Sequence, residues 1–234
     1  FVNLVALPGL STVSDFESES FRANTFSPFG FSIESGNPGD IPEVRTGLAR
    51  VQDEGSQLAA MALVAFRDVK ENETWLDMCA GPGGKAALLS SIAQEAGKDF
   101  TANELSQPRA ELVRQVVGSS RVWVGDGRDI ASHGELFDAV LADVPCTGLG
   151  ALRRRPEVRW RRTVSDLRAL TALQRELSDS AISVIADGGL FAYATCSPHF
   201  AETSVAVVDI LKAHPELEQI DLTEFLPQSI NGAM

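Results

Sequence analysis

From about residue 74 the chain alternates short apolar runs with longer amphipathic stretches. The apolar runs end in polar or glycine residues. They predict buried strands at 74–78, 121–124, 137–142 and 190–194, and a further short strand that ends at Glu104. Helical spacing of apolar residues fills the intervals between them. This alternation predicts an α/β fold with a mostly parallel sheet, covered by helices that connect its strands in right-handed crossovers.

Three helices of this region have predictable ends. The first follows the turn at 79–84 and stops before Gly97. The second is capped by Ser106, stops at Gly118 and should turn inward the apolar residues Leu112, Val113 and Val116. The third is long and closes on Gly188 and Gly189, with its inward face formed by Leu167, Leu170, Leu173, Leu177, Ala181 and Val184.

The first 50 residues differ from the rest of the chain in composition and in the pattern of apolar residues. They are rich in Ser, Pro and Gly, and short aromatic stretches such as Phe26–Phe31 indicate strands or hairpins rather than helices. Apolar residues from Gln57 to Phe66 indicate a helix that packs on the main domain. We therefore divide the chain into a small N-terminal lead-in subdomain, residues 1–50, and a main domain, residues 51–234.

Polar residues of chemical interest follow the ends of the predicted strands. In open parallel sheets, ligands bind beyond the carboxyl ends of the strands, so a site is expected there. The residues that this rule gathers are Asp77, Glu104, Asp126, Asp143, Cys146 and Cys196.

Composition limits the function classes. Hydrophobic residues make up 44% of the 234 residues, and no apolar run approaches the ~20 residues that a membrane-spanning helix needs. No signal peptide is visible, and the three cysteines are widely spaced and form no metal-ligand pattern with the histidines. We expect a soluble cytoplasmic protein with reduced thiols and no metal, and the oligomeric state stays open.

The net charge of −12 argues against nucleic acid binding over the whole surface. However, Arg153, Arg154, Arg155, Arg159, Arg161 and Arg162 lie together around Trp160. A charge run of this kind is usually only a solvated surface. Its place beside the candidate site favours RNA binding here, chiefly through Arg153, Arg154, Arg155 and Arg159.

The turn after the first main strand is rich in glycine, but it lacks the G-x-G-x-x-G and G-K-[ST] patterns of dinucleotide and P-loop sites. Glu104 is placed to accept hydrogen bonds from ribose hydroxyls, and Asp126 to accept one from an adenine amine. Either carboxylate alone could equally be a solvated strand end or a helix cap. Three suitable strand ends in succession indicate an adenosine-containing ligand.

Three motifs make a family resemblance specific. They are Leu76-Asp77-Met78-Cys79-Ala80-Gly81-Pro82-Gly83-Gly84-Lys85, Asp143-Val144-Pro145-Cys146-Thr147-Gly148 and Ala194-Thr195-Cys196-Ser197-Pro198. They resemble the signatures of the Sun (Fmu) family of RNA cytosine-5 methyltransferases, closest to its bacterial small-subunit ribosomal RNA members. The resemblance runs from about Val44 to Asp209. Gly81 stands where alanine is common in that family, and Glu104 stands where aspartate is common.

The resemblance implies a Rossmann-like S-adenosylmethionine-dependent methyltransferase fold, with residues 51–234 as the catalytic domain. It implies S-adenosyl-L-methionine as cofactor, held by Glu104, Asp126, Asp143 and the turn residues Cys79, Ala80, Gly81, Pro82, Gly83, Gly84 and Lys85. Lys85 could orient Asp143, contact the cytosine or be an ordinary exposed lysine.

Carbon 5 of cytosine is too weak a nucleophile to take a methyl group until another nucleophile adds to carbon 6, and a thiolate suits that step. Cys146 and Cys196 follow strands expected to be neighbours, so their thiols can face one base; a disulfide is the competing interpretation. Cys79 alone is more typical of a small core residue. The resemblance implies that Cys196 is the nucleophile and that Cys146 assists product release. Asp143 would lie near ring nitrogen 3 and the exocyclic amine of the target, where a protonated carboxyl could stabilise the adduct. A role as a cap or in a salt bridge is the alternative for Asp143.

The target base must enter a pocket, which favours a single-stranded, looped or flipped-out cytosine. The resemblance points to 16S ribosomal RNA. Transfer RNA and a role as an inactive RNA-binding assembly factor remain alternatives. Members of the family often carry an N-terminal helical RNA-binding domain and a final sheet strand that are not evident here, so we expect the sequence to be a fragment.

Overall fold

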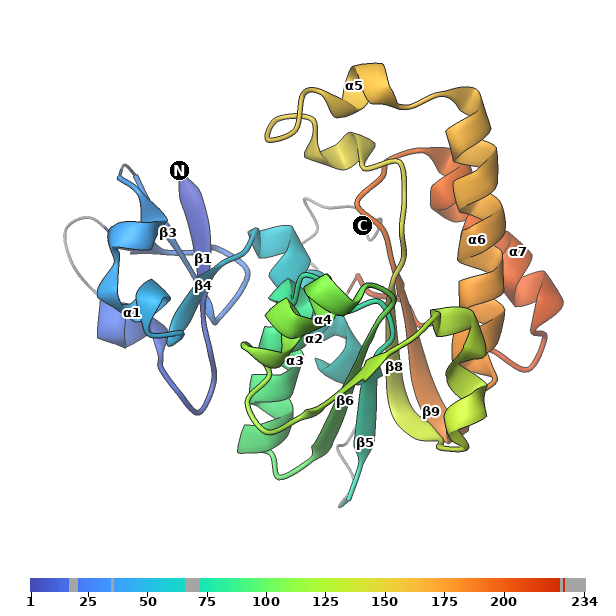
Figure 1. Cartoon of the computed structure of the whole chain (residues 1–234), viewed down its shortest axis with the longest axis horizontal. Coiled ribbons are helices and arrows are strands. Elements are labelled where there is room, and N and C mark those ends of the chain that lie inside the picture. The colour runs from blue at the N-terminus through green and yellow to red at the C-terminus, as the bar shows by residue number, and fades with distance from the viewer. Residues whose placement is uncertain (17–20, 35, 66–71, 224, 226–234) are drawn as a thin grey trace.

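The computed structural model describes residues 1–16, 21–34, 36–65, 72–223 and 225. Two sheets organise these residues, a small antiparallel one near the N-terminus and a larger parallel one after it (Figure 1). The α/β class and the mostly parallel main sheet are therefore confirmed.

The N-terminal sheet has the strand order β2-β3-β1-β4. Its strands are β1 (Val2–Ala6), β2 (Phe21–Ala23), β3 (Gly30–Ile33) and β4 (Ala49–Val51), all paired antiparallel. Phe16 and Phe31 stack with ring centroids 4.4 Å apart in the small core beneath it. The short helices η1 (Val13–Phe16), η2 (Pro38–Asp40) and α1 (Pro42–Arg45) complete this part. Its strand-rich character agrees with the pattern of residues 1–50, while β4 continues one residue further.

The N-terminal sheet is joined to the main domain by shared packing. Val5 and Leu7 belong to the same apolar cluster as Ala60 and Leu63 of α2 (Glu54–Ala65). The buried Gln57 side chain also donates from Nε2 to the carbonyl of Leu4 at 3.0 Å. The predicted helix at 57–66 is thus α2, although it starts earlier, and Phe66 lies outside the described residues.

The parallel sheet has the order β7-β6-β5-β8-β9. Its strands are β5 (Thr74–Asp77), β6 (Asp99–Glu104), β7 (Arg121–Val124), β8 (Phe137–Asp143) and β9 (Ile185–Ala194). Each predicted strand is present. Because β8 pairs with both β5 and β9, the chain segments that follow these three strands emerge side by side.

Helices cover both faces of this sheet (Figure 1). On one face, α2, α3 (Gly84–Glu95) and α4 (Gln107–Arg114) pack on residues such as Trp75, Ala102 and Leu141. On the other, α6 (Val164–Ile182) packs on Leu76 and Val140. Beside α6 lies α7 (Ser204–Ala213), and the short elements η3 (Gly127–His133), η4 (Leu149–Ala151), α5 (Val158–Arg161) and η5 (Phe200–Glu202) fill the connections.

Two details of the predicted helices are wrong. Leu112 is 46% exposed, because α4 turns Val113 and Ala110 toward the core and ends at Arg114, before Gly118. The long helix ends at Ile182, and Gly188 and Gly189 lie inside β9 rather than at its stop. The pairing of β8 with β9 begins at Ile185 and shifts register before Leu190, and Gly188 takes φ 72° there. A glycine tolerates this irregularity because it has no Cβ.

None of the helices in the described part of the chain is both long and apolar enough to cross a membrane.

Candidate active site

The carboxyl ends of the parallel strands gather the predicted site residues at one edge of the sheet. Asp77 ends β5, Glu104 ends β6 and Asp143 ends β8, while Asp126 follows β7. Cys146 and Cys196 come shortly after β8 and β9. The topology thus places these groups together as the strand pattern predicted, and their chemical roles stay predictions.

The turn from Cys79 to Lys85 leads from β5 into α3 and approaches its neighbours closely. Gly83 has φ 109°, and a Cβ there would meet Val116 Cγ2 at 2.7 Å. A Cβ on Gly81 would overlap the carboxylate of Glu104. The turn therefore needs glycine at both positions in this arrangement.

Glu104 is buried and already bound to the backbone of this turn. Its Oε2 accepts from Gly81 N at 2.9 Å, and its Oε1 accepts from Ser106 N at 2.9 Å. The Arg109 guanidinium binds the Gly81 carbonyl and lies 3.6 Å from Glu104 Oε1. Each carboxylate oxygen can accept a further hydrogen bond, so Glu104 keeps acceptor capacity. Ser106 occupies the cap position of α4 without a side-chain capping bond.

Two buried acceptors near the turn have no hydrogen-bond partner among the described residues: Asp77 Oδ2 and Asn103 Oδ1. Asp77 is fully buried, and its other oxygen accepts from Cys79 N at 3.3 Å. Burial and the nearby Asp143 carboxylate raise the pKa of Asp77 to about 7. Buried acceptors of this kind are costly unless a donor reaches them, which suits a ligand that carries donors.

Asp126 has the helix-cap arrangement. Its Oδ1 accepts from Arg128 N at 3.0 Å at the start of η3, and its Oδ2 accepts from Arg128 Nη2 at 2.6 Å. These hydrogen bonds from Arg128 lower the pKa of the Asp126 carboxyl. Arg128 also pairs with Glu176 of α6 at 2.9 Å. The cap that the sequence offered as an alternative is therefore present, and contact with adenine stays a prediction.

Lys85 points to the centre of the site. Its ammonium donates to Asp143 Oδ2 at 2.7 Å, and its side chain is mostly buried. Of the three roles open to Lys85 from the sequence, this geometry favours the orientation of Asp143.

Cys146 and Cys196 are in direct contact, with their sulfur atoms 3.3 Å apart and both thiols free. The Gly150 amide donates to the Cys196 carbonyl at 2.9 Å, which ties one cysteine loop to the other. Hydrogen bonding to Cys196, supported by Thr195 and nearby amides, lowers the pKa of Cys146 to about 6 against the opposing effect of burial. The same thiol–thiol contact and burial raise the pKa of Cys196.

Cys79 differs from the other two cysteines. It packs against the apolar cluster around Leu76, and burial raises the pKa of its thiol. These apolar surroundings favour the core interpretation of Cys79.

The arginine-rich segment follows the Cys146 loop and arches over the same end of the sheet, through η4 and α5 (Figure 1). Arg153, Arg154, Arg155 and Arg159 are exposed, and so is Trp160, at 75%. Arg154 pairs with Asp53. The segment therefore offers exposed cations and an aromatic surface at the carboxyl end of the sheet.

Sequence reasoning missed one group of residues. Glu202 of η5 is fully buried and hydrogen-bonds to Thr147 and to Gln174 of α6. A glutamate shortly after the Thr-Cys-Ser motif gives no periodic signal. Only its burial distinguishes it from the many solvated glutamates of this acidic chain.

Comparison with known proteins agrees with the motifs. The family model described as 16S rRNA methyltransferase RsmB/F matches residues 64–233. The Mycobacterium tuberculosis protein Rv1407 is 48% identical over 221 residues, which cover 92% of this chain and 47% of that protein. Ribosomal RNA small subunit methyltransferase B of Pectobacterium carotovorum is 32% identical over 211 residues, 87% of this chain and 48% of the relative.

A solved structure is similar in fold. The crystal structure of PH0851 superposes with a TM-score of 0.83 and 26% identity, covering 92% of this chain and 50% of that one. The chain spans about half the length of the curated relatives it matches.

Proposed function

The chain belongs to the 16S rRNA methyltransferase RsmB/F family, and we propose that it carries the catalytic centre of an S-adenosylmethionine-dependent enzyme that methylates carbon 5 of a cytosine in 16S ribosomal RNA. The observation that carries the chemistry is the contact of Cys146 and Cys196, with their sulfur atoms 3.3 Å apart at the carboxyl end of a Rossmann-like sheet. Two thiols facing one base suit covalent catalysis at a pyrimidine ring.

The residues at the strand ends fit the cofactor. Asp77 Oδ2 and Asn103 Oδ1 are buried acceptors without partners among the described residues, and an ammonium group would supply donors to them. Glu104 would accept from the ribose hydroxyls and Asp126 from the adenine amine, while the glycines of the turn allow close approach. Bound there, S-adenosylmethionine would supply an electrophilic methyl group.

Cys196 would be the nucleophile, because it is the more exposed of the two thiols. As its sulfur bonds to carbon 6, its proton passes to the Cys146 thiolate across their contact. The electron pair of the C5–C6 double bond would then make carbon 5 nucleophilic toward the methyl group that the cofactor, held at the strand ends, would supply.

Product release reverses the addition. The proton on carbon 5 leaves to solvent, its electron pair restores the double bond, and the bond from carbon 6 to Cys196 breaks. Cys146 returns the proton to the departing Cys196 sulfur. The lowered pKa of Cys146, about 6, leaves it ionised and ready for the first transfer near neutral pH.

Asp143 would accept a hydrogen bond from the exocyclic amine of the cytosine. Its ion pair with Lys85, at 2.7 Å, fixes the direction of the carboxylate. A positioned carboxylate distinguishes cytosine from uracil, because uracil presents an acceptor at that place. Lys85 would balance charge that develops on the ring.

The arginine-rich segment would hold the RNA backbone beside the flipped-out base. Arg153, Arg155 and Arg159 are exposed cations, and Trp160 offers a stacking surface. The overall charge of −12 limits phosphate contacts to this local surface.

The test is methyl transfer from tritiated S-adenosylmethionine to 16S ribosomal RNA and, separately, to bulk transfer RNA. We expect label in the ribosomal RNA, and bisulfite sequencing should place it on a cytosine. Label confined to transfer RNA would transfer the proposal to that substrate. RNA binding without label in either would favour an inactive assembly factor, which has little need for two paired thiols.

A further inference from the structure

Glu202 is a buried carboxylate that the proposed mechanism leaves unused. It ends η5, shortly after Cys196, and its side chain is fully buried without a cation beside it among the described residues. Burying a carboxylate is costly unless several donors satisfy it. The identity of those donors therefore indicates what the residue does.

The donors come from the cysteine loops and α6. Glu202 Oε1 accepts from Thr147 N at 2.8 Å and from Gln174 Nε2 at 3.0 Å, and Oε2 accepts from the Thr147 hydroxyl. Burial by itself raises the pKa of Glu202, but the hydrogen bonds from Ser197, Thr147 and Gln174 outweigh it, so the pKa lies below its ordinary value. Glu202 is therefore a buried anion held by neutral donors.

These donors flank the two thiols in the chain. Thr147 directly follows Cys146, and Ser197 directly follows Cys196. The hydroxyls of Thr147 and Ser197 lie 3.0 Å apart. Gln174 Nε2 also donates to the carbonyl of Pro145, the residue before Cys146, at 2.8 Å. One carboxylate thus connects the loops that carry both cysteines.

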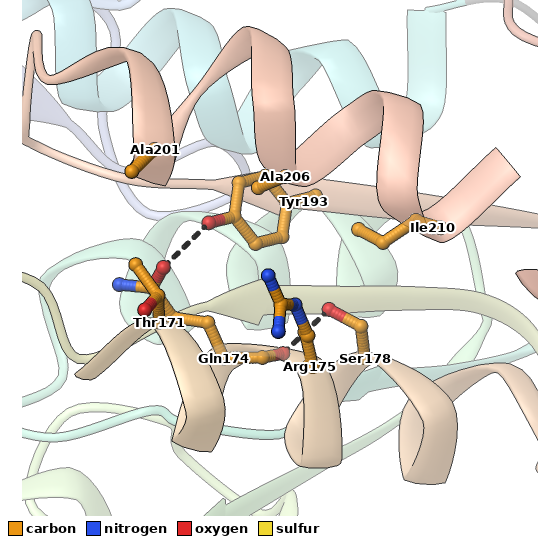
Figure 2. Close-up of a pocket in the computed structure, with 8 residues that line it drawn as sticks. All are labelled: Thr171, Gln174, Arg175, Ser178, Tyr193, Ala201, Ala206 and Ile210. Atoms are coloured by element: carbon orange, nitrogen blue, oxygen red, sulfur yellow. Dashed lines mark hydrogen bonds between the residues drawn. The ribbon is translucent and has the colours of Figure 1, made fainter. Parts of the chain in front are cut away.

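The network packs against Tyr193 and the tightly packed residues between α6 and α7. The Tyr193 hydroxyl donates to the Glu202 carbonyl at 2.9 Å. It also lies 3.2 Å from Gln174 Oε1, and Figure 2 draws Tyr193 and Gln174 with this contact between them. The cavity beside them, also lined by Ala201, Ala206 and Ile210, has a volume of about 10 Å³. That is room for no more than a water molecule, so this cavity is not a ligand pocket and leaves the hydrogen-bond network little space to rearrange.

We propose that Glu202 is a positioning residue, which holds the Pro-Cys and Thr-Cys-Ser loops in register and so maintains the contact between Cys146 and Cys196. Its catalytic meaning rests on the proposed function, whereas its effect on the thiols does not. If the loops separate, the hydrogen bond between the two sulfur atoms weakens. Cys146 then loses the main interaction that favours its thiolate.

The test follows alkylation of Cys146 by iodoacetamide from about pH 5 to about pH 9, read by mass spectrometry, in wild type and Glu202→Gln. The wild-type midpoint should lie near the pKa of Cys146, about 6. The charged and titratable groups that face the pair are Asp143, Lys85, Tyr193 and Glu202. If Glu202 positions the loops, its replacement should raise the midpoint toward the ordinary cysteine pKa of about 8.5.

The opposite outcomes overturn the proposal. Loss of a negative charge acting through space would lower the midpoint, and a merely structural residue would change the melting temperature but leave the midpoint in place. Glu135→Gln makes the same chemical change on the surface, before β8 and away from the thiols, and should leave the midpoint unaltered. If Glu202→Gln does not fold, Ser197→Ala removes one donor of the network, and the same upward shift is expected of it.

Kinetics supply the second readout. Glu202→Gln should lower kcat for RNA methylation by roughly 10- to 100-fold, while KM for RNA and cofactor changes little. Glu202→Asp keeps the charge and should recover part of the loss. A wild-type protein without methylation would remove the proposed function, and the alkylation midpoint would still decide the role of Glu202.

Discussion

The sulfur atoms of Cys146 and Cys196 lie 3.3 Å apart, although the two residues are separated by the whole of α5, α6 and β9 in the chain. The pairing of β8 with β9 brings their loops together, and the Gly150 amide bonds one loop to the carbonyl of Cys196. The contact divides the roles of two chemically identical side chains, since it lowers the pKa of Cys146 and raises that of Cys196.

Single replacements of these cysteines should have different effects on covalent RNA adducts. Cys196→Ala should abolish methylation and any adduct, because the thiol that attacks carbon 6 is lost. In Cys146→Ala, Cys196 loses the neighbour that raises its pKa and can still attack, but release slows and an adduct should accumulate. Denaturing gels with labelled RNA and cofactor show both results. An adduct in Cys196→Ala that is missing in Cys146→Ala would reverse the assignment.

Gly81 and Glu104 should be energetically coupled. A Cβ at position 81 would overlap the Glu104 carboxylate, and the shorter aspartate would leave room for it. We expect Gly81→Ala to lower the free energy of unfolding by about 1–3 kcal/mol and Glu104→Asp to restore most of that loss in the double variant. Gly84→Ala is the control, because a Cβ there meets nothing within 4 Å. Additive effects in denaturant unfolding would show that the two departures from the family pattern are independent.

Asp126 should contribute to cofactor affinity beyond its role as a cap. We expect Asp126→Ala to weaken S-adenosylmethionine and its demethylated product alike, by roughly tenfold or more, because a charge-assisted hydrogen bond is lost. Calorimetry measures both affinities. Asp129→Ala removes an exposed carboxylate from the same short helix and should bind normally. Unchanged affinity in Asp126→Ala would leave this residue as the cap of η3 only.

The arginine-rich segment should determine the salt dependence of RNA binding. Replacing Arg153, Arg154 and Arg155 with glutamine should flatten the slope of log K against log salt by about two, if each contacts one phosphate of single-stranded RNA. Cofactor affinity should not change. The charge-matched control replaces three exposed arginines elsewhere, Arg22, Arg114 and Arg121. Equal slopes in the two triple variants would show that the segment is an ordinary solvated surface without RNA contacts.

Asp77 should make the ligand-free protein less stable as the pH rises. Its pKa is about 7 in the folded chain and about 3.9 when unfolded, so stability present at low pH is lost between about pH 4 and pH 7. The full effect is at most about 4 kcal/mol. Asp77→Asn should flatten this decline in denaturant melts, whereas the exposed Asp187→Asn should not. An identical pH dependence in wild type and Asp77→Asn would exclude Asp77 as its cause.

The sequence by itself determined the succession of strands and glycine turns along the chain and which polar residues stand at the strand ends. Apolar runs and glycine turns report local burial and backbone freedom, which is why β5 to β9 and the turn at 79–85 could be predicted. The same local signals misplaced the ends of α4 and α6. Leu112 is apolar but faces outward, and Gly188 serves an irregular strand rather than a helix stop.

Only the tertiary structure decided which polar groups meet. The bonds from Glu202 to Thr147 and Gln174, from Lys85 to Asp143 and between the two thiols join residues far apart in the chain. Asp126 shows the same limit, since its strand-end position was predictable but its engagement by Arg128 and, through it, Glu176 was not. Hydrogen bonds of this kind depend on side-chain directions set by packing across the sheet, and periodicity along a single chain carries no record of them.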